Sequence, residues 1–315
     1  MRIRLITPAP PNSKSGNRAT AARWGAILQE LGHRVQISVD YGGEPAEMMV
    51  ALHAWRSAGA IAAFAERFPE RPLIVSLTGT DAYRFIHSHP ETTLRSIALA
   101  HRLVGLHDLI GETVPPEHRD KVRIIYQSAL PIPDREPLQR SFRICVAGHL
   151  REEKDPLRPA MAVRDVPPES RLRVDHYGKA HSAEWAAAAE AEMTRNLRYH
   201  WHGEIPYDGI RRVYAKSHVL ALPSRMEGGA NVVSEAVVAG LPVIASRIPG
   251  SIGLLGEDYP GFYPVEDADA LRALLLEAES NPAFYGRLSE ACEARRHLFT
   301  PEREREGWKN LLAEF

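Results

Sequence analysis

The chain has 315 residues, 44% hydrophobic residues and a formal net charge of −1. This length corresponds to about two domains, and the near-neutral charge offers no general attraction to nucleic acid or membranes. No apolar run approaches the roughly 18 residues that a membrane-spanning helix needs. The start, MRIRLITPAPP, carries charges inside its apolar stretch and predicts a strand, not a signal peptide. Two cysteines without metal-ligand spacing are typical of a reducing compartment. We therefore expect a cytoplasmic protein.

Apolar runs of strand length alternate with helix-length segments along the whole chain. Such alternation predicts parallel sheets that are covered on both faces, hence an α/β protein. A helix is expected over 19–31, ended by Gly32. We expect two Rossmann-like domains that face each other across a cleft. The expected strands are 3–7, 35–39, 49–52, 73–77, 103–106 and 122–126 in the first half, then 142–146, 172–176, 199–202, 219–222 and 242–245 in the second.

Three prolines between Ala129 and Ser141 are typical of a linker. The expected division is therefore 1–132 for an N-terminal Rossmann-like domain and 142–298 for a C-terminal Rossmann-like domain. The end of the chain, 299–315, predicts a helix that packs back on the N-terminal domain. Its apolar face would carry Trp308, Leu311, Leu312 and Phe315.

Polar residues follow the strands of the first half, where ligands of parallel sheets bind. After the first strand, SKSGNR offers an anion cradle with Lys14, Gly16, Asn17 and Arg18, or simply a capped flexible loop. After the third and fourth strands, Arg56 and the segment LTGTDAYR add cations and hydroxyl groups. The candidates there are His53, Thr78, Thr80 and Arg84; a structural role for His53 and a plain turn at Gly79 are the alternatives.

The first strand of the second half ends in VAGHLREEK. Lys154 can reach a diphosphate, and Gly148 lets the backbone approach it. His149 and Arg151 lie between them. A solvated loop of mixed charge is the alternative interpretation.

The segment EGGANVVSEAVVAGLPV, residues 227–243, predicts a glycine-containing loop and a helix after the strand 219–222. The amino end of such a helix favours anions. Glu227 and Glu235 enclose seven residues, and carboxylates accept hydrogen bonds from sugar hydroxyls. The combination indicates a nucleotide sugar, although glycines before a helix are also common in ordinary junctions.

This segment resembles the donor signature of GT-B glycosyltransferases of family 4. The resemblance extends to VAGHLREEKDP, WHGEIPYDGIRRVYAKSHVLALPS and SGNRATAARWGAILQELGHRV, and so covers nearly the whole chain. It implies that Glu227 binds the donor sugar, that Glu235 binds the ribose and that Lys154 contacts the diphosphate. Catalytic roles are implied for Glu227, Lys154 and His149. The implied donor-binding residues are Gly16, Gly148, Arg151, Glu204, Gly228, Gly229, Ala230, Asn231 and Glu235.

Two positions depart from the family pattern. His149 replaces the usual arginine after the strand, and Thr78 replaces the usual histidine of the loop after the fourth strand. Neither an obligatory metal nor a cofactor is expected, because no Asp-x-Asp cation site is apparent. The expected partners are small-molecule substrates only.

A narrower resemblance is to the selenosugar synthases of the selenoneine pathway, carried by SGNR, LTGTD, IIYQSA, GHLREEKDP and SRMEGGANVVSEAVVAG. It implies transfer of the sugar from UDP-N-acetylglucosamine or UDP-glucose to selenophosphate. The acceptor site would use Lys14, Asn17, Arg18, His53, Thr78, Thr80 and Arg84. Two alternatives stay open: a family 4 transferase that acts on a hydroxyl group, and a non-catalytic nucleotide-sugar sensor.

Overall fold

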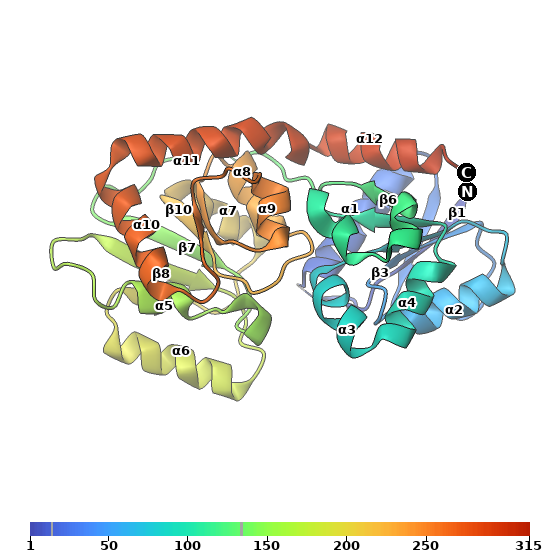
Figure 1. Ribbon diagram of the computed structural model, residues 1–315, viewed down its shortest axis with the longest axis horizontal. Coiled ribbons are helices and arrows are strands. Elements are labelled where there is room, and N and C mark those ends of the chain that lie inside the picture. The colour runs from blue at the N-terminus through green and yellow to red at the C-terminus, as the bar shows by residue number, and fades with distance from the viewer. Residues whose placement is uncertain (14, 133–134) are drawn as a thin grey trace. The chain divides into compact units, whose positions relative to one another are not determined.

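The structure is a computed structural model that describes residues 1–13, 15–132 and 135–315. It divides into two compact units. Unit 1 comprises Met1–Gln127, Glu227–Asn231 and Pro301–Phe315, and unit 2 comprises Ser128–Met226 and Val232–Thr300. Each unit contains a six-stranded parallel sheet with helices packed against it (Figure 1). The expected α/β class is confirmed.

The sheet of unit 1 has the order β2-β1-β3-β4-β5-β6. The expected strands of this half are confirmed with shifts of one or two residues at their ends. The strands are β1 (Arg2–Ile6), β2 (Arg34–Ser38), β3 (Met48–Leu52), β4 (Leu73–Ser76), β5 (Arg102–Gly105) and β6 (Val122–Ile124). The helices are α1 (Gly16–Glu30), α2 (Ala58–Arg67), η1 (Asp81–Phe85), α3 (Ile86–Ser88), α4 (Pro90–Leu99), η2 (Asp108–Thr113), η3 (Pro116–Lys121) and α12 (Pro301–Leu312).

Central strand β3 explains why both faces of this sheet are covered. All five of its residues are buried, and they alternate between two hydrophobic clusters. Met49 and Ala51 join the cluster that contains residues of α2 and α4, whereas Met48 and Val50 join the cluster that contains residues of α1 and α12. A strand that is apolar at every position is typical of such a sheet.

The C-terminal helix α12 belongs to unit 1. Trp308 packs edge-on against Trp24 of α1 with ring centroids 4.8 Å apart, and Leu311 is also buried. Buried Glu304 accepts hydrogen bonds from Arg23 Nε at 2.9 Å and Trp24 Nε1 at 2.8 Å. The expectation for Phe315 is wrong: α12 ends at Leu312, and Phe315 is 46% exposed beside Arg102.

The sheet of unit 2 has the order β12-β11-β10-β7-β8-β9. All five expected strands are present, and the short β12 is an addition. The strands are β7 (Phe142–Ala147), β8 (Leu172–Tyr177), β9 (Tyr199–Trp201), β10 (Val219–Leu222), β11 (Val243–Ser246) and β12 (Phe262–Tyr263). The helices are η4 (Glu152–Lys154), α5 (Arg158–Ala162), α6 (Ala183–Arg195), α7 (Tyr207–Lys216), α8 (Asn231–Val238), α9 (Pro249–Leu255), α10 (Ala268–Ser280), α11 (Pro282–Arg295) and η5 (Arg296–Phe299).

The expected linker is attached to unit 2 over its described part. Arg135 Nη2 donates to the carbonyl of Ser217 at 2.7 Å, and Glu136 N–H donates to the carbonyl of Ala215 at 2.9 Å. Residues 133–134 of the linker lie outside the described residues. Within the described chain, no helix combines the length and the hydropathy required to cross a bilayer.

Candidate active site

The carboxyl ends of β7 and β10 form a pocket in unit 2. Its lining comprises 146–149 at the end of β7, 221–224 at the end of β10, Lys154, Pro156 and His176. The pocket is shallow and open to solvent. This is the place in a parallel sheet where ligands bind. The structure thus brings Gly148, His149 and Lys154 to one pocket.

Lys154 and His149 differ in charge in this pocket. Lys154 is half-buried on η4 and supplies a positive charge. Burial, and next the neighbouring ring of His181, lower the pKa of His149 to about 4. His149 is therefore neutral at pH 7, and its Nδ1 accepts a hydrogen bond from Lys179 N–H at 3.1 Å. The replacement of the usual arginine by histidine removes a positive charge from this loop.

Arg151 lies three residues before Lys154 and makes a long ion pair, with Nε 3.9 Å from Glu153 Oε2. Its buried Nε has no hydrogen-bond partner among the described residues. Glu204 is exposed, and its negative charge opposes the fall in the pKa of His149. The Glu204 carboxylate therefore lies close enough to His149 to act on its charge.

A buried histidine fixes the backbone of the pocket. His176, at the end of β8, is fully buried, and its Nε2 lies 3.0 Å from the carbonyl oxygen of Gly148. Because a carbonyl only accepts, Nε2 carries the proton and Nδ1 accepts from the Tyr199 hydroxyl at 3.0 Å. Burial lowers the pKa of His176 to about 4, so the ring stays neutral. This residue was not among the candidates from sequence.

The loops after β7 and β8 also approach each other closely at their backbones. A Cβ on Gly178 would lie 2.0 Å from the Gly148 carbonyl oxygen, so only glycine fits after β8. Gly148 itself would meet no atom within 4 Å of a Cβ. Gly148 therefore leaves open space at the pocket, whereas Gly178 is needed for packing.

Glu235 lies on the second turn of α8 in unit 2. Its Oε2 accepts a hydrogen bond of 2.8 Å from the hydroxyl of Tyr214, which is 1% exposed on α7. The neighbouring positions Ser234 and Ala236 are buried, whereas Glu235 is half-buried. No sequence pattern pointed to Tyr214, because an aromatic residue in an amphipathic helix predicts only core packing.

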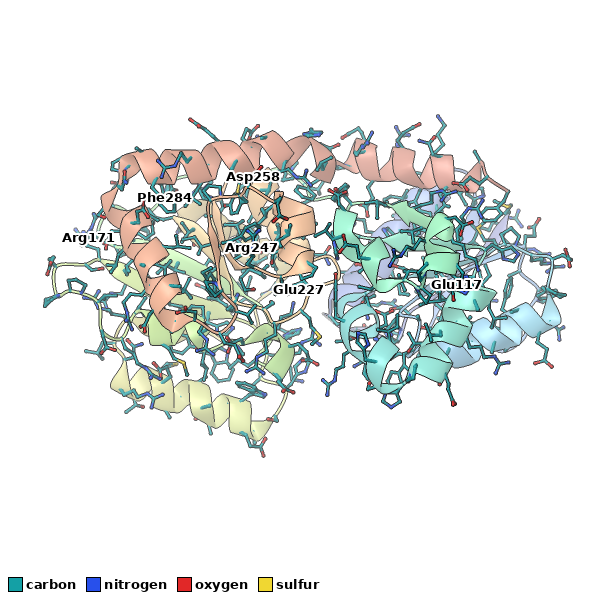
Figure 2. All side chains as sticks on the ribbon, viewed as in Figure 1. Glu117, Arg171, Glu227, Arg247, Asp258 and Phe284 are labelled. Carbon is teal, nitrogen blue, oxygen red and sulfur yellow. The ribbon has the colours of Figure 1, made fainter. Side chains whose placement is uncertain are left out.

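The glycine loop before α8 belongs to unit 1 and carries Glu227, which is labelled in Figure 2 and is 7% exposed. A Cβ on Gly228 would lie 2.2 Å from Gly79 N, and one on Gly229 would lie 2.3 Å from Leu106 Cβ. The glycines thus permit close packing within unit 1. Ala230, between Gly229 and Asn231, is also buried.

Two side chains hold this loop in place. Gln127 Nε2 donates to the Gly229 carbonyl at 2.7 Å, and Arg23 Nη2 donates to Asn231 Oδ1 at 3.2 Å. Arg23 Nη2 also donates to Gln127 Oε1 at 2.7 Å. Sequence reasoning missed both residues, because their partners lie about 100 positions or more away.

In unit 1, Asp81 ties the loops after β3 and β4 together. It is fully buried and accepts from Ala54 N–H at 2.7 Å, Thr78 N–H at 2.6 Å and the Thr78 hydroxyl at 2.7 Å. Both donors of Thr78 are thereby directed to Asp81.

His53 and Thr80 form a second pair at the same edge. His53 is buried with φ of +76°, and its Nδ1 accepts from Arg56 N–H at 3.2 Å. Nε2 therefore carries the proton and donates to Thr80 Oγ1 at 3.0 Å. Burial lowers the pKa of His53, so the ring is neutral at pH 7. The Thr80 hydroxyl is left to donate elsewhere.

The remaining candidates of unit 1 lie in the segments after β1 and β4. Gly16, Asn17 and Arg18 form the first turn of α1, where Ser15 takes the N-cap position without a side-chain cap bond. Arg84 is exposed on η1. Because β1, β3 and β4 are neighbours in a parallel sheet, these segments share one edge. Lys14 lies outside the described residues. The part of the chain that is described contains no cluster of three metal-ligating side chains.

Comparison with solved structures shows the fold. Over all of this chain, HepE from Anabaena, in a complex with UDP and glucose, matches with a TM-score of 0.78, 13% identity and 100% of its own length. Sucrose-phosphate synthase from Thermosynechococcus elongatus matches with 0.81, 16% identity and 98% of its length. A glycosyltransferase from Rickettsia africae matches with 0.72 and 12% identity, covering 99% of this chain and 97% of its own. The chain therefore has the GT-B fold.

Sequence comparison gives the family. No curated protein matches the sequence. The family model described as glycosyl transferases group 1 matches residues 133–295, which is more than half of the chain and includes Gly148, Lys154, Glu227 and Glu235. This chain belongs to the glycosyl transferases group 1 family.

Proposed function

We propose that this glycosyltransferase uses a UDP-sugar, UDP-N-acetylglucosamine or UDP-glucose, and transfers the sugar to selenophosphate with formation of a carbon–selenium bond. The observation that carries the donor half is the pocket at the ends of β7 and β10, where Lys154 and the open backbone at Gly148 meet. The structure of HepE, which has the same fold, holds UDP and glucose.

Each donor group has a matching partner in the proposal. Lys154 neutralises the diphosphate, the carboxylate of Glu235 accepts from the ribose hydroxyls, and Glu227 accepts from the donor sugar. Because His149 is neutral, the charge that develops on departing UDP is met by Lys154 and by N–H groups at the start of α8. We propose that this arrangement needs no divalent cation.

Selenophosphate as the acceptor is supported by the chemistry of the unit 1 edge. Arg18, Arg56 and Arg84 follow three neighbouring strands, and the Thr80 hydroxyl can donate a further hydrogen bond. Both ring nitrogens of nearby His53 are already engaged, Nδ1 by Arg56 N–H and Nε2 by Thr80 Oγ1, so this ring has no free lone pair with which to act as a general base. A selenium anion is nucleophilic at pH 7 without such a base, whereas a sugar hydroxyl requires one.

The transfer step is balanced without a further reactant. A selenium lone pair forms the C1–Se bond as the C1–O bond to the β-phosphate breaks, and that electron pair leaves on UDP. The first product is a sugar joined through selenium to the phosphoryl group. The enzyme's task is to hold the two anions in line and to stabilise the leaving diphosphate.

The test is an acceptor panel with each UDP-sugar, followed by mass spectrometry. Selenophosphate should give a product with the selenium isotope pattern at C1, whereas inorganic phosphate and simple alcohols should not react. Addition of EDTA should leave the rate unchanged. Transfer only to a hydroxyl compound would refute the selenophosphate acceptor and leave a group 1 transferase with a hydroxyl acceptor.

A further inference from the structure

The contact between Tyr214 and Glu235 links a buried core residue to the proposed nucleotide site. Tyr214 lies on α7, which packs on β7, and its hydroxyl donates to Glu235 Oε2 at 2.8 Å. Both residues belong to unit 2, and only Glu235 is accessible to solvent.

The direction of this hydrogen bond follows from the chemistry of the pair. Burial raises the pKa of Tyr214 well above its ordinary value, and the neighbouring carboxylate of Glu235 raises it further. The hydroxyl therefore keeps its proton and is a permanent donor. An ionised carboxylate only accepts, so Glu235 accepts this hydrogen bond and keeps further lone pairs that can accept from other donors.

We infer that Tyr214 positions Glu235, by holding Oε2 so that the carboxylate is preset to accept hydrogen bonds from the ribose hydroxyls of the nucleotide. This inference deepens the proposed function and rests on its UDP-sugar donor. A glutamate on an accessible helix turn otherwise samples several rotamers, and binding must then restrict them. The bond from an immobile tyrosine restricts them before the ligand arrives, which is preorganisation.

Tyr214 is a positioning residue, because it does not itself touch the ligand. The variant Tyr214→Phe removes only the hydroxyl and keeps the aromatic volume in the core. We expect it to raise the dissociation constant for UDP about tenfold, as measured by calorimetry. The matched control is Tyr259→Phe: Tyr259 is also buried in unit 2, but its hydroxyl contacts the backbone of Val243, so the UDP affinity should not change.

A second ligand separates positioning from a general structural effect. UDP that lacks both ribose hydroxyls, 2′,3′-dideoxy-UDP, has nothing for Glu235 to accept. The tenfold loss in Tyr214→Phe should therefore vanish with dideoxy-UDP. Because both ligands are compared within one variant, a change in overall stability affects both measurements alike. Equal weakening of the two ligands, or unchanged UDP affinity, would overturn the inference.

The double variant gives an independent check. In a background of Glu235→Ala, the change Tyr214→Phe should cause no further loss of UDP affinity, because the carboxylate that it positions is gone. Additive losses would contradict the inference. If the wild-type protein does not bind UDP, the proposed donor is wrong, and the inference, which depends on that donor, is wrong as well. If wild type binds UDP and only the Tyr214 arms fail, the donor proposal stands alone.

Discussion

Within each unit, a buried side chain holds the loops at the strand ends in place, and the chemistry of that interaction is opposite in the two units. In unit 1, the Asp81 carboxylate collects N–H and O–H donors from the loops after β3 and β4. In unit 2, the neutral His176 ring donates to the Gly148 carbonyl after β7. The interaction in unit 1 uses N–H and O–H donors of the loops, whereas the interaction in unit 2 uses a backbone carbonyl acceptor.

The difference determines what each edge offers to a ligand. At the unit 1 edge, the N–H and hydroxyl of Thr78 donate to Asp81, so the anionic acceptor that we propose would be bound by the arginines and by Thr80. At the unit 2 edge, the positive charge of Lys154 and the half-buried carboxylate of Glu235 suit a molecule that carries both phosphates and hydroxyls.

Lys154→Ala should lower kcat about 10²- to 10³-fold, since its charge acts most strongly as UDP departs. Steady-state kinetics with saturating donor measures the effect. Lys216→Ala, which removes an exposed lysine at the end of α7, is the control and should be near wild type. A near-normal kcat in Lys154→Ala would assign this lysine to an ordinary solvated loop.

Asp81→Asn should reduce the free energy of unfolding by about 3 kcal/mol, because an amide cannot satisfy all the buried donors that the carboxylate accepts. Chemical denaturation measures the loss. Asp40→Asn, at an exposed position of the same unit, should change little. A stability loss no larger than that of the control would show that Asp81 does not hold the unit 1 edge.

The contribution of buried His176 to the free energy of unfolding should decrease in acid. Its pKa is about 4 in the fold and about 6.5 in the unfolded chain, so the unfolded state binds more protons between these values. Stability is full above pH 6.5 and falls as the pH drops toward 4. Relative to His176→Gln, which does not titrate, wild type should lose about 3 kcal/mol more between pH 7 and pH 4. Parallel stability curves for the two proteins would be evidence against this assignment.

Glu235→Ala should weaken UDP binding by roughly 1.5–3 kcal/mol, which is about 10- to 150-fold, as hydrogen bonds from the ribose to a charged group are lost. Isothermal calorimetry on the folded variant measures it. An unchanged affinity would remove Glu235 from the nucleotide site. Glu190→Ala, an exposed change on α6, is the matched control.

Arg18→Ala should raise the KM for selenophosphate about tenfold, because one charged contact to the acceptor is lost, and should leave UDP binding intact. The control is Arg34→Ala, at the opposite end of the same sheet, where β2 begins. A parallel rise in the Kd for UDP would place Arg18 outside a separate acceptor site.

The strands and their order along the chain could be predicted from sequence, because buried parallel strands are continuous apolar runs bounded by polar loops. The strand-helix junction at Glu227 and the lysine after β7 could be identified in the same way. β12 was not predicted because Phe262–Tyr263 is only two residues long. The exposure of Phe315 was not predicted because α12 ends three residues before it.

Local pattern determined the α/β class, the candidate loops and the two glutamates, since periodicity and loop composition are properties of neighbouring residues. Only the tertiary structure decided the pairings Tyr214–Glu235, His176–Gly148 and Gln127–Gly229. It also decided that His149 is neutral. Hydrogen-bond partners and burial depend on residues that are distant in sequence, and burial sets the charge of a histidine. No local pattern contains that information.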